Sequence, residues 1–293
     1  MKVSAVLLIA MFCPLAGYSQ DSLVLKNGKR IAYTRLVMYD DQVEIKNEQT
    51  KEFETYPCEL VYGYSEGMKE RTYFLKSNPE SEGSGYFFLK RLKVGRVSLF
   101  ENTGNDQSLY VEKDGRFEKA LGLTEKKSKK VERLETFKSF VADDDESLAY
   151  IASSGFKFGW KDISRVIEYY NKRNFIEREP SGDDVYGYVY LYRTQFQKTK
   201  QGIKITLNGQ QHDLYIEDYI ILSLPVAYAS MLHLRDSEVN STQILSGELE
   251  EQYFEVLYDS KTNTFKFDKK EGTELRYEFF KIKDKVGARV IHD

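Results

Sequence analysis

Residues 23–31 read LVLKNGKRI, so an apolar run is followed by an Asn-Gly pair and by a second segment that ends in Ile31. An Asn-Gly pair accepts the positive φ angles of a type I′ turn, and this turn joins two antiparallel strands with the twist that sheets prefer. The stretch therefore predicts a β-hairpin near the beginning of the chain.

Further short strands are predicted after this hairpin, each bounded by turn residues. We expect them at 36–38, 42–46, 53–56, 61–64, 71–76, 86–92, 96–101, 109–113 and 116–119. The segment 77–85 combines Pro, Gly and Ser and predicts a loop. A β-meander or a small barrel accounts for this succession of strands.

The hydrophobic period changes from two to about 3.6 after residue 124, which predicts a helical segment. One helix is expected from about Ser128 and another with Asp162 as its N-cap. Their apolar stripes are Val131, Leu134, Phe137 and Val141 in the first, and Ile163, Val166, Ile167 and Tyr170 in the second. A shorter helix is expected at 147–152, capped by the acidic run 143–146.

Strand patterns return after 175–184, which reads as a linker. An Asn-Gly pair at 208–209 predicts a second hairpin, over 203–215. Other strands are expected at 185–193, 219–224, 229–234, 243–249, 253–258, 264–267 and 275–282. Their number and spacing favour an antiparallel β-sandwich.

The predicted fold is thus mainly β with a small helical segment. We expect a signal peptide at 1–19, an N-terminal β-rich domain at 20–124, a helical segment at 125–179 packed on that domain, and a C-terminal β-sandwich at 180–293. The N-terminal domain is a β-meander or small barrel.

The first 19 residues have the three parts of an export signal. Lys2 provides the positive charge, 3–12 is apolar, and small residues at 17 and 19 precede a cleavage position. The apolar run is shorter than the roughly 20 residues that span a bilayer. We therefore expect an exported protein, periplasmic or on the surface of a Gram-negative bacterium, with no transmembrane segment in the mature chain.

Composition excludes several classes of protein. With 22 Tyr and 18 Phe the chain has enough apolar surface to fold, so disorder is excluded. Its 43 basic and 46 acidic side chains leave a net charge of −3, which does not favour nucleic-acid binding. Cys13 belongs to the signal, so Cys58 stands alone, and we interpret it as a buried structural thiol.

Candidate catalytic chemistry is confined to Ser65. Residues 63–67 fit the pattern G-x-S-x-G, in which a nucleophilic serine sits between a strand and a helix. Here 71–74 predicts another strand, so we interpret the motif as a glycine-flanked hairpin turn. A serine hydrolase at Ser65 is the least favoured function.

Metal and cofactor sites are not expected. His212, His233 and His292 lack metal-binding spacing, and the acids at 143–146 are consecutive, without the alternation and the glycine of a calcium loop. The basic run at 126–130, with Arg133, is interpreted as a solvated helix face.

Tyrosines alternate along one predicted strand, at Tyr186, Tyr188, Tyr190 and Tyr192. A period of two places all four on one face of the strand. Such a row either packs against the rest of the chain or forms a platform for a ligand or partner, because tyrosine presents a rigid apolar ring and a hydroxyl group. The sequence leaves both interpretations open.

Four segments carry a resemblance to known sequences: DSLVLKNGKRI at 21–31, YFFLKRL at 86–92, LYVEKDG at 109–115 and IEYYN at 167–171. Through these segments the chain resembles uncharacterised exported proteins of Bacteroidota-type bacteria. The second half is similar to an envelope-lipoprotein β-domain of unknown function, through VYLYR at 189–193 and 247–254, but it has Leu-Pro-Val at 224–226 where that domain has Pro-Gly. The resemblance implies location and fold, and no catalytic residues.

These observations favour an exported cell-envelope protein without enzymatic activity, which binds a protein or helps envelope assembly. The alternative is a carbohydrate-binding module that uses the tyrosine face of 185–193. The expected partner is another envelope protein or a glycan, without a cofactor.

Overall fold

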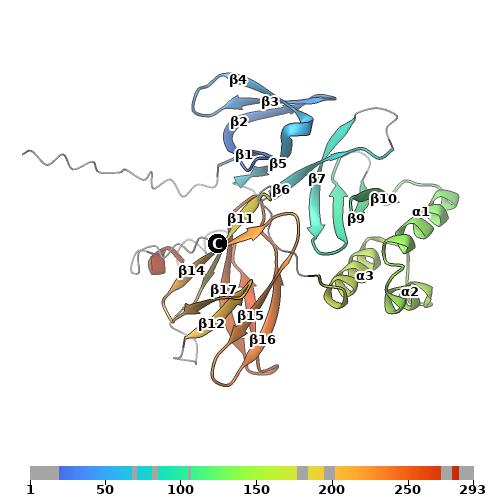
Figure 1. Cartoon of the computed structure of the whole chain (residues 1–293). Coiled ribbons are helices and arrows are strands. Elements are labelled where there is room, and N and C mark those ends of the chain that lie inside the picture. Colours follow the sequence, from blue (N-terminus) through green and yellow to red (C-terminus); the bar gives the residue numbers. More distant parts are fainter. Residues whose placement is uncertain are drawn as a thin grey trace, which may run out of the picture.

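The computed structural model describes residues 20–67, 71–80, 85–104, 107–176, 184–194, 202–271 and 279–283. Over these residues the chain forms one ten-stranded antiparallel sheet, two four-stranded sheets and a helical segment (Figure 1). The predicted mainly β fold is therefore confirmed. The expected export signal, most of the linker, the middle of the 77–85 loop and His292 lie outside the described residues.

The ten-stranded sheet follows chain order with one exception. Its order is β10-β9-β8-β7-β6-β5-β1-β2-β3-β4, so β5 returns to pair with β1, and β4 and β10 are the edges. Within the described residues the sheet does not close, which favours the meander over the barrel. The strands are β1 (Ser22–Leu25), β2 (Arg30–Met38), β3 (Gln42–Asn47), β4 (Phe53–Pro57), β5 (Val61–Glu66), β6 (Arg71–Ser77), β7 (Tyr86–Lys93), β8 (Ser98–Asn102), β9 (Ser108–Lys113) and β10 (Arg116–Gly122).

The first hairpin forms as predicted, but its turn is not type I′. Val24 pairs with Arg30, and the N–H of Gly28 donates to the carbonyl of Leu25 at 2.9 Å, so the loop is longer than two residues. Only Gly28, with φ +80°, has a positive φ in the Asn-Gly pair. At 208–209 both residues have positive φ, as a type I′ turn requires, because β12 and β13 are joined by these two residues alone.

The helices α1 (Lys127–Phe140), α2 (Asp145–Ala152) and α3 (Trp160–Arg173) cover one face of the sheet at β7–β10 (Figure 1). The stripe of α3 is buried in full, as predicted. In α1 the prediction is wrong for Val131, which is 59% exposed. Arg133 occupies the inward position there and forms ion pairs with Glu80 and Glu125.

The capping predictions have different outcomes. The carboxylate of Asp144 accepts a hydrogen bond from the N–H of Ser147 at 3.1 Å, so the acidic run caps α2 as expected. Asp162 is not the N-cap of α3, because that helix begins earlier, after Gly159. The Asp162 carboxylate instead accepts a bond from the N–H of Lys157 at 2.8 Å and closes the preceding loop.

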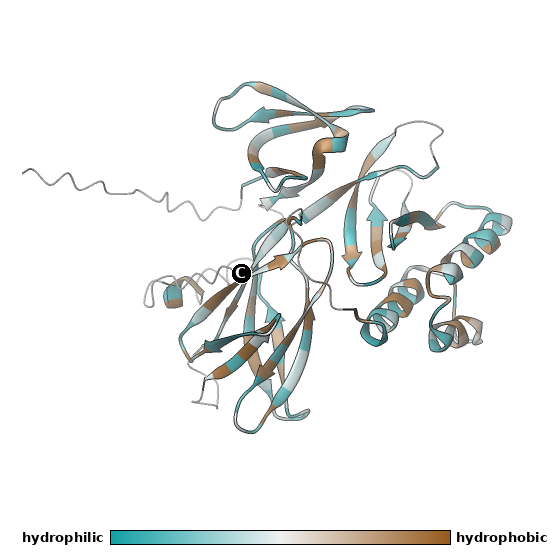
Figure 2. Ribbon diagram, viewed as in Figure 1, coloured by the Kyte–Doolittle hydropathy of each residue, from teal (hydrophilic) through white to brown (hydrophobic). Residues whose placement is uncertain are grey.

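The second half is a β-sandwich, as predicted. Its sheets have the orders β14-β11-β17-β18 and β13-β12-β15-β16, and apolar residues of both sheets form a common core. Figure 2 shows apolar residues (brown) along these strands. The β11–β17 pair is parallel and the other pairs are antiparallel. The strands are β11 (Tyr186–Tyr192), β12 (Ile203–Leu207), β13 (Gln210–Leu214), β14 (Tyr219–Pro225), β15 (Ser230–Arg235), β16 (Asn240–Leu245), β17 (Gln252–Asp259) and β18 (Thr264–Lys269).

The sandwich packs on the face of the ten-stranded sheet opposite the helices. In β8, Leu99 contacts the helical core and Phe100 the sandwich side, because successive side chains point to opposite faces. Val226 and Leu249 of the sandwich join the same apolar cluster as Phe100. We call this contact the seam.

Two arginines of the ten-stranded sheet bind backbone carbonyls of the sandwich across the seam. Arg91 donates to Val226 and, at 3.0 Å, to Gly247. Arg30 donates to Leu249 and, at 3.3 Å, to Tyr186. These bonds satisfy carbonyls that the sandwich ladders leave free.

Candidate functional site

The tyrosine row lies on the face of β11 that points away from the sandwich core, and its four members have different surroundings. Tyr188 is 45% exposed, whereas Tyr192 is fully buried. Tyr186 and Tyr190 are half-buried. The row is therefore partly a packing surface and partly open, so each interpretation of the sequence describes one end of it.

The buried end of the row forms an aromatic pocket, which we define as Tyr190, Tyr192, Tyr219 and Tyr253. The ring of Phe279 fills this pocket, with centroids 5.3, 5.7, 5.3 and 5.0 Å from those four rings in that order. All four contacts are edge-to-face, a favourable geometry for aromatic pairs. Residues 279–283 are helical, so the strand predicted at 275–282 is wrong at its end.

A carboxylate holds two rings of the aromatic pocket in place through hydrogen bonds. Glu251 accepts hydrogen bonds from the hydroxyl of Tyr190 at 3.0 Å and from that of Tyr253 at 2.6 Å. The two rings stack at 4.6 Å. Burial, reinforced by Glu251, raises the pKa of both hydroxyls well above the ordinary value, so both remain neutral donors.

Ser65 is built into a sheet rather than presented at its end. It is 2% exposed, lies within β5, and its hydroxyl is 2.9 Å from that of Ser22 on β1. A nucleophile elbow needs an exposed hydroxyl before a helix. The residue lies in the strand before the hairpin turn, not in the turn as the sequence suggested, and β6 follows. His212 and His233, on β13 and β15, belong to the sandwich.

Cys58 is buried, as the sequence suggested. Burial raises the pKa of its thiol, and Asp41 and Glu59 raise it further. A raised pKa disfavours the nucleophilic thiolate. The contacts of Cys58 are those of the small core under β1–β5.

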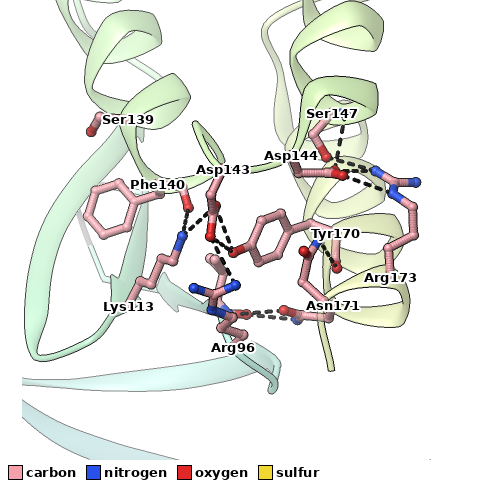
Figure 3. Close-up of polar contacts among 12 residues, drawn as sticks. Arg96, Lys113, Ser139, Phe140, Asp143, Asp144, Ser147, Tyr170, Asn171 and Arg173 are labelled. Atoms are coloured by element: carbon pink, nitrogen blue, oxygen red, sulfur yellow. Dashed lines mark hydrogen bonds and ion pairs between the residues drawn. The ribbon is translucent and has the colours of Figure 1, made fainter. Parts of the chain in front are cut away.

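The acidic run divides between two ion-pair groups (Figure 3). Asp143 accepts hydrogen bonds from Lys113 at 2.7 Å and from the hydroxyl of Tyr170 at 2.9 Å, and it pairs with Arg96 at 2.9 Å. Asp144 pairs instead with Arg173 of α3. Among the residues described, no group of His, Cys, Asp and Glu side chains has the geometry of a metal site.

Both carboxylates are held in the charged form. Burial acts to raise the pKa of Asp143, but the hydrogen bonds from Lys113 and Tyr170 outweigh it, and the pKa lies below the ordinary value. The hydrogen bond from Arg173 lowers the pKa of Asp144 to about 2. These groups stabilise the helical segment on the sheet, which is a structural role.

The free edge of β4 is the feature of this structure most suited to a partner. At the other sheet edges, β13 and β14 contact each other across the sandwich, β16 lies along β18, and α1 packs on the face of the sheet at β10. Gln243 of β16 donates to the carbonyl of Phe265 at 2.9 Å, and the N–H of Phe265 donates to Ser241 at 3.1 Å. Among the described strands, β4 pairs with β3 on one side and with no strand on the other.

The hydrogen-bonding pattern between β3 and β4 determines which backbone groups of β4 point outward. The N–H of Asn47 donates to Glu52 at 2.9 Å and the N–H of Cys58 donates to Asp41 at 2.8 Å. In an antiparallel pair such bonds recur at every second residue, so even-numbered residues of β4 bond to β3. Odd-numbered residues point their backbone groups outward.

The outward residues are Phe53, Thr55 and Pro57, and all three side chains are exposed. The edge offers the N–H groups of Phe53 and Thr55 and the carbonyls of all three residues. Pro57 has no N–H, but its nitrogen faces outward, so no hydrogen bond between β4 and β3 is lost. Phe53 is 56% exposed and adds an apolar contact beside the edge.

Sequence reasoning missed Arg30, Arg91 and Phe279. Arg91 could have been found, because it shares the inward-facing alternation of Phe87 and Leu89 in β7, where a charge requires a specific partner. No local pattern identifies Phe279 as the residue that covers the tyrosines.

No protein-family model, curated protein or solved structure matches this chain. No helix of the described part has the length and apolarity to cross a membrane. The assignment of a function therefore rests on the geometry above.

Proposed function

We propose that this chain is an exported cell-envelope protein without enzymatic activity, which binds another protein by adding a strand of the partner to β4. The observation that carries the proposal is the edge of β4, which pairs with β3 on one side and with no described strand on the other. The export pattern at 1–19 and the resemblance to exported proteins of Bacteroidota-type bacteria support the location.

Strand addition fits the chemistry of this edge. Main-chain hydrogen bonds give affinity in such complexes, and alternating side chains give specificity. The exposed ring of Phe53 and the methyl group of Thr55 lie on one face of β4 and would contact alternate side chains of the partner strand. Free edges of natural sheets are normally blocked, because they pair with other chains.

The test uses a pair of substitutions at one residue. Thr55→Pro removes the outward N–H while the bonds from Glu54 and Tyr56 to β3 remain, so partner recovery from an envelope fraction should fall at least tenfold. Thr55→Val keeps the N–H and should recover the partner as the wild type does. Equal recovery with both variants, each with wild-type circular dichroism, would exclude strand addition at β4.

A second candidate is glycan binding at the open end of the tyrosine row. The supporting observation is Tyr188, which is 45% exposed beside the half-buried Tyr186 and Tyr190. An exposed ring of this kind stacks on sugars. Tyr188→Ala should abolish binding on a glycan array, whereas Tyr215→Ala, at an exposed tyrosine of the β13–β14 connection, should not. Absence of binding by the wild type would end this alternative.

A further inference from the structure

A cavity of about 550 Å³ lies at the seam. Its floor is the sandwich-facing side of β5–β9, and residue 227, in the connection from β14 to β15, closes one side of it. This volume lies within the range of ordinary small-molecule sites, about 300–1,000 Å³. None of the residues considered above as binding candidates lines it.

The floor of the cavity is aromatic. Tyr62, Phe74 and Phe100 come from β5, β6 and β8, and their rings meet edge to face, with Phe74 5.8 Å from Tyr62 and 6.1 Å from Phe100. Burial raises the pKa of the Tyr62 hydroxyl to about 12, although Arg91 opposes the shift. The floor therefore offers the half-buried ring of Tyr62 and its neutral phenol, supported by the two buried phenylalanines.

The walls of the cavity are mainly cationic. They contain Lys26, Lys76, Arg91, Arg96 and Lys113, against Glu112 and Asp114. Asp143 and Glu248 approach these cations from outside the lining. Asp184 also acts on the Tyr62 hydroxyl of the floor, so the charges around the cavity balance, and the cations outnumber the acids only in the lining itself.

Two of the cations retain hydrogen-bonding capacity. The Nε atoms of Arg91 and Arg96 are buried and have no hydrogen-bond partner among the described residues. The Arg91 side chain is 4% exposed and lies over the ring of Phe74 at 4.5 Å. Lys76 lies 5.0 Å from the ring centre of Phe100. A buried donor without a partner is costly, and an anion would remove that cost.

We propose that this cavity binds a small monoanion with an aromatic or aliphatic body, such as an aromatic carboxylate or sulfonate. The body of the ligand lies against the half-buried ring of Tyr62, and its anionic group lies among the arginine and lysine side chains. The two buried Nε donors match the oxygens of a single anionic group. This site is separate from β4, so the two proposals succeed or fail independently.

Two probes with the same ring system test the class of ligand. The anion 8-anilinonaphthalene-1-sulfonate should bind the full chain with one saturable site and enhanced fluorescence. N-phenyl-1-naphthylamine, which lacks the sulfonate, should bind at least tenfold more weakly. Equal affinity for the two probes would overturn the assignment of an anion site.

Substitutions at the mouth of the cavity test its location. Ala227 is exposed and lines the cavity, so Ala227→Trp should fill it and weaken sulfonate binding at least tenfold. Ser77→Trp fills it from β6 and should act in the same way. The control Thr262→Trp, in the exposed β17–β18 turn, should leave affinity unchanged. Unchanged binding by both cavity variants, with wild-type circular dichroism, would overturn the proposal.

Discussion

Asp143 and Asp144 are neighbours in the chain, but their carboxylates stabilise different contacts. Asp144 caps α2, and this role was predictable because an acid before a short apolar period is typical of a helix start. Asp143 binds Lys113 and Tyr170, which are 30 and 27 residues away. Local sequence patterns do not encode such distant contacts. The helix cap at Asp144 was therefore predictable, and the contacts of Asp143 were not.

Asp144→Ala should lower the free energy of unfolding by about 1–2 kcal/mol, because α2 loses its N-cap. Asp144→Asn retains a capping oxygen and should cost less than half as much. Urea denaturation at neutral pH measures both. Equal losses in the two variants would show that the cap contributes nothing beyond the ion pair with Arg173.

The effect of Asp144→Ala should depend on pH. The pKa of Asp144 is lowered from 3.8 to about 2 in the folded state, so its charge stabilises the fold fully above the unfolded value of 3.8. This contribution is lost as the pH falls to about 2. The difference in stability between wild type and variant should therefore shrink over that window. A difference that stays constant across it would contradict the lowered pKa.

At the scale of elements, the strands of the first sheet were predictable because turn residues separate short alternating segments. The prediction failed at 279–283, where Phe279 and Ile282 are buried one helical turn apart. Five residues are too few to distinguish a helical period from a strand period. The helical conformation of 279–283 is therefore decided by packing on the tyrosines, which is a tertiary effect.

Phe279→Ala should release residues 279–283 from the aromatic pocket. Replacing a buried phenylalanine by alanine lowers stability by about 3–5 kcal/mol, which is large relative to the few contacts of a five-residue helix. Hydrogen exchange should accelerate at 279–283 and stay slow in β17. The control Lys281→Ala, at an exposed residue of the same turn, should change neither. Persistent protection of 279–283 in Phe279→Ala would show that other contacts hold the segment.

At the scale of the molecule, the seam joins parts that are distant in sequence. Arg91 binds Val226 and Gly247, and Arg30 binds Leu249. Each half could be assigned from its own periodicity, but nothing in either half specifies the other as its partner. The fold of the halves was therefore predictable, and the seam with its cavity was not.

Arg91→Met should weaken the seam by about 3 kcal/mol, because two carbonyls and Glu248 lose a buried donor. Calorimetry should then resolve separate transitions for the two halves. Glu248→Gln should cost less than about 1 kcal/mol, since its carboxylate is partly solvated. A single cooperative transition in Arg91→Met, at the wild-type temperature, would contradict this role of Arg91.

The central claim, that a partner strand pairs with β4, is tested most directly by photo-cross-linking in the cells that produce the protein. With Phe53→p-benzoylphenylalanine, irradiation should give one adduct with a partner protein, and adding Thr55→Pro should remove it. The same reporter at Val131, exposed on α1, should give no such adduct. Absence of an adduct at position 53, or an adduct that survives Thr55→Pro, would contradict the account.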